Sequence, residues 1–169
     1  MITGSSMFSR FDRSIVPGLT LGGVWFAGVS LGLWAARFYG GPFGALAPAV
    51  FGAELSFWNA CLAAVHPLFL SAFAVYFFHH FGIYLACALR GIAMGFFLGA
   101  LVAVCGLRLS FLLGFSGLSG CGVLLWFLWR RFGASPMFGD ILYALAALMA
   151  VAAVDIWVIA PYLAQLPPI

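Results

Sequence analysis

The chain has 169 residues, of which 66% are hydrophobic and only 7% are charged. Soluble domains carry roughly 25% charged residues because their surface must stay solvated, so this composition excludes a water-soluble globule. Seven arginines, no lysine and four acidic residues give a net charge of +3, which leaves no basic patch for nucleic acid. We therefore expect most of the surface to face a lipid bilayer.

Five apolar runs are long enough to cross the hydrocarbon core, which is about 30 Å thick and needs about 20 helical residues. They cover residues 14–36, 56–78, 81–106, 109–129 and 140–161. The predicted fold is an all-α polytopic transmembrane bundle of about five spans. It forms a single domain from 14 to 162, between a cytoplasmic N-terminal segment (1–13) and a short C-terminal tail (163–169).

The connection between the first two runs, residues 38–55, is rich in Gly, Pro and Ala and includes Pro42 and Pro48. It suits a segment that lies in the membrane interface, and a short re-entrant hairpin is the alternative. The other connections are short, so helices that follow one another in sequence are expected to be near neighbours.

The placement of arginines predicts the orientation, because cytoplasmic loops are enriched in positive charge. With the N-terminus inside, the cytoplasmic arginines are Arg10, Arg13, Arg130 and Arg131, and the outside ones are Arg37 and Arg108. This balance favours a multi-pass membrane protein with its N-terminus in the cytoplasm and its C-terminus outside.

Small residues recur at helical spacing within the runs. They are Gly28 and Gly32 in the first run, Gly91, Gly95 and Gly99 in the third, and Gly114 and Gly117 in the fourth. Such stripes let two helix backbones approach closely, so we expect these glycines to pack against other helices. A substrate path lined by small residues is the alternative.

Arg90 is an ionisable side chain within the third run. If that run begins at Phe81, Arg90 lies roughly 13 Å along it, at about 1.5 Å per residue. An intramembrane arginine is costly and marks a functional site by default. Alternatively, residues 81–89 form an interfacial or bent half-helix from which Arg90 reaches the headgroups. That interpretation predicts a break in the third span at Arg90 and Gly91.

Asp155 is the acidic counterpart, roughly 22 Å into the fifth run by the same helical rise. A carboxylate at that depth needs a partner or a neutralising proton. One interpretation pairs Asp155 with Arg90, across a difference in depth of about 9 Å. The other places it in the outer water layer, where Trp157 and Tyr162 anchor the helix at the interface.

The second run carries a polar face. Asn59 and His66 are seven residues apart and therefore lie on one side of the helix. Pro67 has no N–H to donate, which leaves a free carbonyl one turn earlier and favours a kink. Hydrogen bonding between helices is the simpler interpretation, and a binding site beside the kink is the alternative.

No catalytic, cofactor-binding or metal site is predicted. The cysteines form no CxxC pair, and His79 and His80 point about 100° apart on a helix, which suits no shared metal ion. Residues 114–117 read Gly-Phe-Ser-Gly, the pattern of rhomboid-type intramembrane proteases. Those enzymes need a later histidine to activate the serine, and none follows His80, so an enzyme is not expected.

The stretch from Pro67 through Leu101 resembles the membrane core of the stage II sporulation protein M family. In that family an apolar span leads into a segment with a glycine, here Gly82, and then into a basic residue followed by glycine that opens a glycine-rich span. Arg90 and Gly91, with Gly95 and Gly99, occupy these places. The number of spans and the size of the chain are also compatible with the family.

The resemblance implies a non-enzymatic scaffold of the bacterial inner membrane that anchors partner proteins such as peptidoglycan hydrolases during sporulation engulfment. Its glycine-lined grooves would hold the spans of these partners or of a second copy. The alternative function is a small membrane transporter, or the membrane subunit of one. In that case Arg90, Asp155, Asn59 and His66 converge on a polar site.

Overall fold

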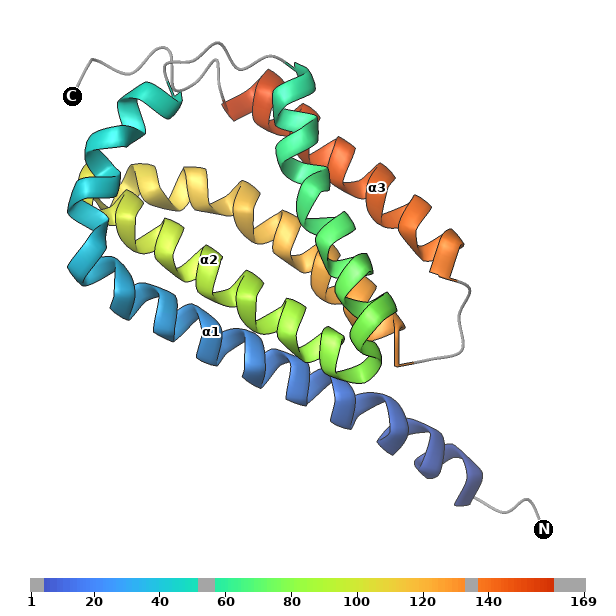
Figure 1. Ribbon diagram of the computed structural model, residues 1–169. Coiled ribbons are helices and arrows are strands. Elements are labelled where there is room, and N and C mark those ends of the chain that lie inside the picture. The colour runs from blue at the N-terminus through green and yellow to red at the C-terminus, as the bar shows by residue number, and fades with distance from the viewer. Residues whose placement is uncertain (1–4, 52–56, 133–136, 160–169) are drawn as a thin grey trace.

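The computed structural model describes residues 5–51, 57–132 and 137–159, and every secondary-structure element in these ranges is helical. α1 spans Ser5–Phe51, α2 spans Phe57–Arg130 and α3 spans Met137–Val154. A short π-helix, η1, follows α3 directly over Asp155–Ile159. The prediction of an all-α fold is confirmed. α2 packs against both α1 and α3 and so holds the bundle together (Figure 1).

α2 folds back on itself at His79, where the backbone takes a φ of 51°. This left-handed conformation is uncommon for a residue with a side chain, and it turns the helix through a tight corner. Gly82 lies against the backbone of Ala74 just beyond the corner. The first arm of α2, residues 57–78, is therefore antiparallel to its second arm, residues 81–103 (Figure 1).

The direction of α2 reverses again between residues 103 and 117 (Figure 1). A third arm, residues 117–130, then returns alongside the second arm. Met94 of the second arm lies against Gly117 of the third, where a Cβ on the glycine would be 3.1 Å from the Met94 sulfur. The long α2 thus supplies three antiparallel arms of the bundle from one helical element.

The break expected at Arg90 and Gly91 is wrong, because α2 is helical through both residues. The glycine there serves close packing against α1 and not a hinge. A helix inside a bilayer also keeps its backbone hydrogen bonds, since hydrocarbon offers no other partner. The corner of α2 lies eleven residues earlier, at His79.

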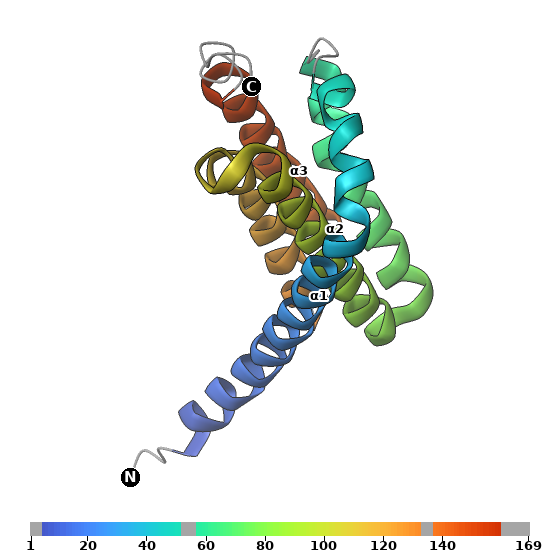
Figure 2. The ribbon, with the colours of Figure 1, turned by 90° about the vertical axis from the view of Figure 1, so that its left-hand side faces the viewer.

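The segment expected to lie in the interface, residues 38–55, is helical as far as Phe51 and belongs to α1. The later part of α1, cyan in Figure 1, bends away from the direction of the earlier part. Residues 52–56 lie outside the described part of the chain. The first turns of α1 extend beyond the rest of the bundle in both views (Figures 1 and 2).

Within the described ranges, three helical segments are long and apolar enough to cross a membrane: Val16–Tyr39, Val65–Ala103 and Met137–Val158. Large apolar side chains cover their outer faces. Leu19, Phe26, Tyr76, Phe138 and Trp157 are each between 68% and 75% exposed. Side chains of this kind on the outside, with charge so sparse, are those of a membrane-embedded protein.

Hydroxyl groups on the outer face of α1 are satisfied within the helix. Thr20 Oγ1 donates to the carbonyls of Val16 and Pro17 at 3.1 and 2.9 Å, and Ser30 Oγ donates to Phe26 at 3.0 Å. A hydroxyl that faces hydrocarbon has no water to bond, so bonding to the preceding turn removes the penalty of an unpaired donor.

The core joins all three helices. Phe127 and Leu128 of the third arm of α2 are fully enclosed with Leu21 of α1, Leu68 of the first arm and Leu148 of α3. These side chains contact one another across the bundle and leave the outer faces to lipid.

Several helix ends meet at one end of the bundle. The ring of His80 stacks on Phe132 with ring centres 6.0 Å apart, and Gly18 faces Trp129. The corner of α2 at His79, the last turn of α2 and the early part of α1 therefore share this end, together with the start of α3 (Figure 1). Arg130 and Arg131 lie here as well.

Candidate functional site

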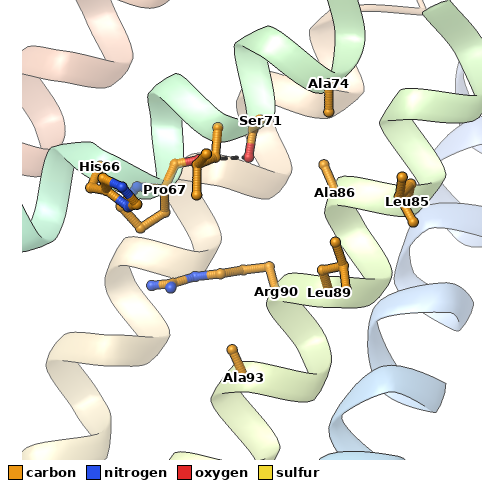
Figure 3. A pocket seen from close by; sticks show the side chains of 10 residues that line it. His66, Pro67, Ser71, Ala74, Leu85, Ala86, Leu89, Arg90 and Ala93 are labelled. Carbon is orange, nitrogen blue, oxygen red and sulfur yellow. Dashed lines mark hydrogen bonds between the residues drawn. The ribbon is translucent and has the colours of Figure 1, made fainter. Parts of the chain in front are cut away.

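A cavity of about 320 Å³ lies between the first and second arms of α2. Its polar lining comes from His66 and Ser71 on the first arm and Arg90 on the second. The rest is apolar: Pro67, Leu70, Ala74, Leu85, Ala86, Leu89 and Ala93. Figure 3 shows the Arg90 side chain extended across the gap toward the side on which His66 lies. Two of the four polar residues singled out from the sequence therefore line one cavity.

Ser71 is already engaged within its helix. Its Oγ donates to the carbonyl of Pro67 at 2.8 Å (Figure 3), which removes the hydroxyl proton from the set of groups that can bind a ligand. The polar character of the cavity therefore rests on the guanidinium of Arg90 and the imidazole of His66. His66 is exposed on the outer face of the first arm, at the mouth of the cavity.

Behind the cavity, Arg90 contacts groups from two other segments. The Cys121 thiol of the third arm lies beside the Arg90 guanidinium and beside the indole of Trp25 in α1. Arg90 Nε and Trp25 Nε1 are nevertheless buried without a hydrogen-bond partner among the described residues. A thiol is a weak acceptor, so the half-buried Arg90 side chain keeps unused donor capacity.

A second buried thiol lies on the same arm as Arg90. Cys87, one turn earlier on the same arm, is fully buried, and its Sγ donates to the carbonyl of Leu21 at 3.3 Å. Cys61, Cys87 and Cys121 are all free thiols. The described residues contain no group of three or more His, Cys, Asp or Glu side chains that could hold a metal ion.

Arg90 and His66 lie at similar depth. Measured along the arms from the corner at His79, His66 is about 20 Å away and Arg90 about 16 Å away, at about 1.5 Å per residue. For a corner at one face of a hydrocarbon core about 30 Å thick, both distances correspond to the middle of the core.

The expected pair of Arg90 with Asp155 does not form in the described part of the chain. The ion pairs there join Asp140 to Arg130 and Arg131, and none includes Arg90. Asp155 lies in η1, which contacts α2 and α3, and its Oδ1 is buried. It does not line the cavity. The Asn59 side chain lies outside the described residues.

The glycine stripe of the second arm faces α1. A Cβ on Gly91 would lie 2.5 Å from the Trp25 carbonyl oxygen and 3.2 Å from Gly28 Cα, and one on Gly95 would collide with the backbone of Val29. A Cβ on Gly99 would lie 2.5 Å from the side-chain Cβ of Ala36. The stripe therefore packs two helices of this chain together and is not open to a partner. Gly114 lies outside the residues whose side chains are described.

An ionic cluster ties α2 to α3 at the end where the helices meet. Arg131 Nη2 pairs with Asp140 Oδ2, and Arg130 Nε lies 3.3 Å from Asp140 Oδ1. Burial, and then the neighbouring charge of Arg130, hold the pKa of Arg131 below its usual value. Arginine stays protonated even so, and Asp140 offsets the cost of burying its charge. Asp140 also lies in the first turn of α3, where the helix dipole favours a carboxylate.

The sequence did not reveal the groups behind Arg90. Cys87 and Arg90 are three residues apart, so their helical spacing placed them on neighbouring positions. Nothing in the sequence linked either residue to Cys121 or Trp25, which come from other segments. No protein-family model, no curated protein and no solved structure matches this chain.

Proposed function

We propose that the protein is a small membrane transporter, or the membrane subunit of one, that binds an organic anion at Arg90. One observation supports it: a guanidinium at mid-depth lines a mainly apolar cavity and has no carboxylate partner among the described residues. An uncompensated charge inside hydrocarbon is costly. An anion supplied from outside the chain offsets that cost, and His66 offers it a second polar contact.

Replacing Arg90 with glutamine is expected to abolish stabilisation by anions. The purified full chain is heated in detergent with acetate, benzoate, octanoate or phosphate, and unfolding is followed by a dye that reacts with the buried thiols of Cys61, Cys87 and Cys121. At 100 times its dissociation constant a ligand stabilises by about 2.7 kcal/mol, which raises the midpoint by about 5–10 °C.

The matched control is Arg37→Gln, since Arg37 is exposed on α1 and does not line the cavity. This variant keeps the anion-induced shift of the parent protein. The proposal is overturned if no anion of the panel raises the midpoint, or if Arg90→Gln retains the shift. For the anion that binds, uptake into proteoliposomes that depends on Arg90 then establishes transport.

We also propose five crossings of a bacterial inner membrane, with the N-terminus in the cytoplasm. The corner at His79 and the reversal before residue 117 support this count, because together they divide α2 into three antiparallel arms. Alkaline phosphatase fused after Phe132 is expected to be inactive, and the same enzyme fused after Ile169 is expected to be active. Activity at Phe132, or equal activity at both sites, contradicts the proposed topology.

The sporulation scaffold implied by the family resemblance stays a second proposal. The outer face of the first arm favours it, because Phe69, Phe73 and Phe77 are all more than half exposed there and offer a broad aromatic surface to a partner span such as that of a peptidoglycan hydrolase. A scaffold of this kind does not need an anion at Arg90. The anion experiment therefore separates the two proposals.

A further inference from the structure

We propose that the ligand of the Arg90 cavity is a single-tailed carboxylic acid of about eight carbons that enters from the bilayer. The inference rests on the proposed function, because it names the substrate class of the same site. Three features of the cavity carry it: the single fixed charge in its lining, the apolar character of the remainder and the direction in which it opens.

The charge of the lining fits a monoanion. Arg90 is the one permanently charged side chain among the residues that line the cavity, and a guanidinium binds a carboxylate through two parallel hydrogen bonds. A dianionic phosphate ester would leave one charge unbalanced in surroundings that solvate ions poorly. Figure 3 shows the terminal nitrogens of Arg90 at the tip of the side chain, and these two groups together can donate to the two carboxylate oxygens.

The size and apolar walls of the cavity fit a short hydrocarbon tail. Beyond Arg90, His66 and Ser71, the lining is made only of alanine, leucine and proline side chains. A volume of about 320 Å³ holds about ten groups the size of a water molecule, at about 30 Å³ each. An eight-carbon fatty acid has that many non-hydrogen atoms, whereas acetate leaves most of the apolar wall uncovered.

The cavity opens toward lipid. Leu70 and Leu89 line it and are also 57% and 58% exposed on the outer surface of the bundle. His66, which lines it too, is exposed near the middle of the membrane, where an uncovered imidazole lacks water to bond. An amphiphile already dissolved in the bilayer can reach this mouth directly and cover the imidazole with its carboxylate.

Equilibrium binding of radiolabelled octanoate to the purified full chain tests the inference. Acetate, which lacks the tail, and octanol, which lacks the charge, serve as competitors. Octanoate is expected to bind at least about 100-fold more tightly than acetate, because each buried methylene adds to affinity. It is expected to bind about 10- to 100-fold more tightly than octanol, because a charge-assisted hydrogen bond is lost.

A rim variant tests the route of entry. Leu89→Trp places a larger side chain at the mouth of the cavity and is expected to weaken octanoate binding at least 10-fold. Leu142→Trp is the matched control, because Leu142 is 50% exposed on α3 and does not line the cavity. This control keeps the affinity of the parent protein, and melting of both variants verifies that they fold.

The outcomes distinguish this inference from the proposed function. If acetate or phosphate binds as tightly as octanoate and depends on Arg90, the anion site stands and the fatty-acid inference is overturned. Octanol that competes as well as octanoate, or Leu89→Trp that binds octanoate normally, also overturns the inference. If no anion binds in an Arg90-dependent way, both proposals fail together.

Discussion

Gly95→Ala is expected to push α1 and α2 apart and to destabilise the bundle by about 1–3 kcal/mol, the usual cost of overpacking. The new methyl group would collide with backbone atoms of Val29. Backbone atoms cannot move aside by a change of rotamer, so the two helices must separate. Thermal unfolding in detergent, read by the buried thiols, should show a midpoint lower by about 3–10 °C. Gly95→Leu is expected to lower it further.

Gly122→Ala is the matched control in the same helix, because a Cβ at Gly122 would meet nothing within 4 Å. Its unfolding midpoint should equal that of the parent protein or rise slightly, since alanine favours a helix more than glycine does. If both alanine variants lowered the unfolding midpoint equally, the backbones of α1 and α2 would not be in the described contact at Gly95. A scaffold that holds partners through Gly95 would instead keep a stable bundle and lose its partner.

Arg131→Leu is expected to be at least as damaging, at about 3–5 kcal/mol, because it leaves the Asp140 carboxylate buried without its closest counter-charge. The side chains of Arg131 and Asp140 are only 6% and 5% exposed. The double variant Arg131→Leu with Asp140→Leu should regain much of the stability that Arg131→Leu loses, since apolar groups can replace a buried ion pair at little cost in free energy. The same melting assay measures both variants.

Arg130 provides the comparison for this ion pair. Its side chain is 43% exposed, it also lies over the ring of Trp126, and exposed pairs contribute about 0–1 kcal/mol. Arg130→Leu should therefore change the midpoint by only a few degrees. A loss at Arg130 as large as the loss at Arg131, or a double variant no more stable than Arg131→Leu, contradicts the assignment of the buried pair.

Hydropathy predicts the helices of this protein well and their corners only in part. The apolar runs 56–78 and 81–106 are separated by His79 and His80, and the structure turns at His79. The same reasoning placed a second break at Arg90 and Gly91, because a charge next to a glycine resembles the end of a span. That glycine instead contacts α1, and the contact partner of a residue cannot be read from its own helix.

The residues of the Arg90 cavity are also predicted from the sequence only in part. Arg90 and His66 stand out as lone polar residues in apolar runs, and the antiparallel register of the first two arms brings both to one cavity. The sequence did not indicate that Cys121 lies beside Arg90, because a cysteine in an apolar run resembles any small core residue. The pairing proposed for Asp155 rested on its charge, which is opposite to that of Arg90, and charge does not specify which neighbour a side chain faces.

The glycines of α1 contact the second arm of α2, which is synthesised after the first arm, and this order bears on how the protein is assembled at the ribosome. Gly28 and Gly32 pack against the part of the second arm that includes Gly91 and Gly95. That part is synthesised about 60 residues later, which takes about 3–12 s at about 5–20 residues per second. During that interval the nascent first helix presents an uncovered glycine face to the bilayer. Membrane insertion and helix pairing are thus separate steps in the biogenesis of this chain, and insertase chaperones have a defined surface to shield.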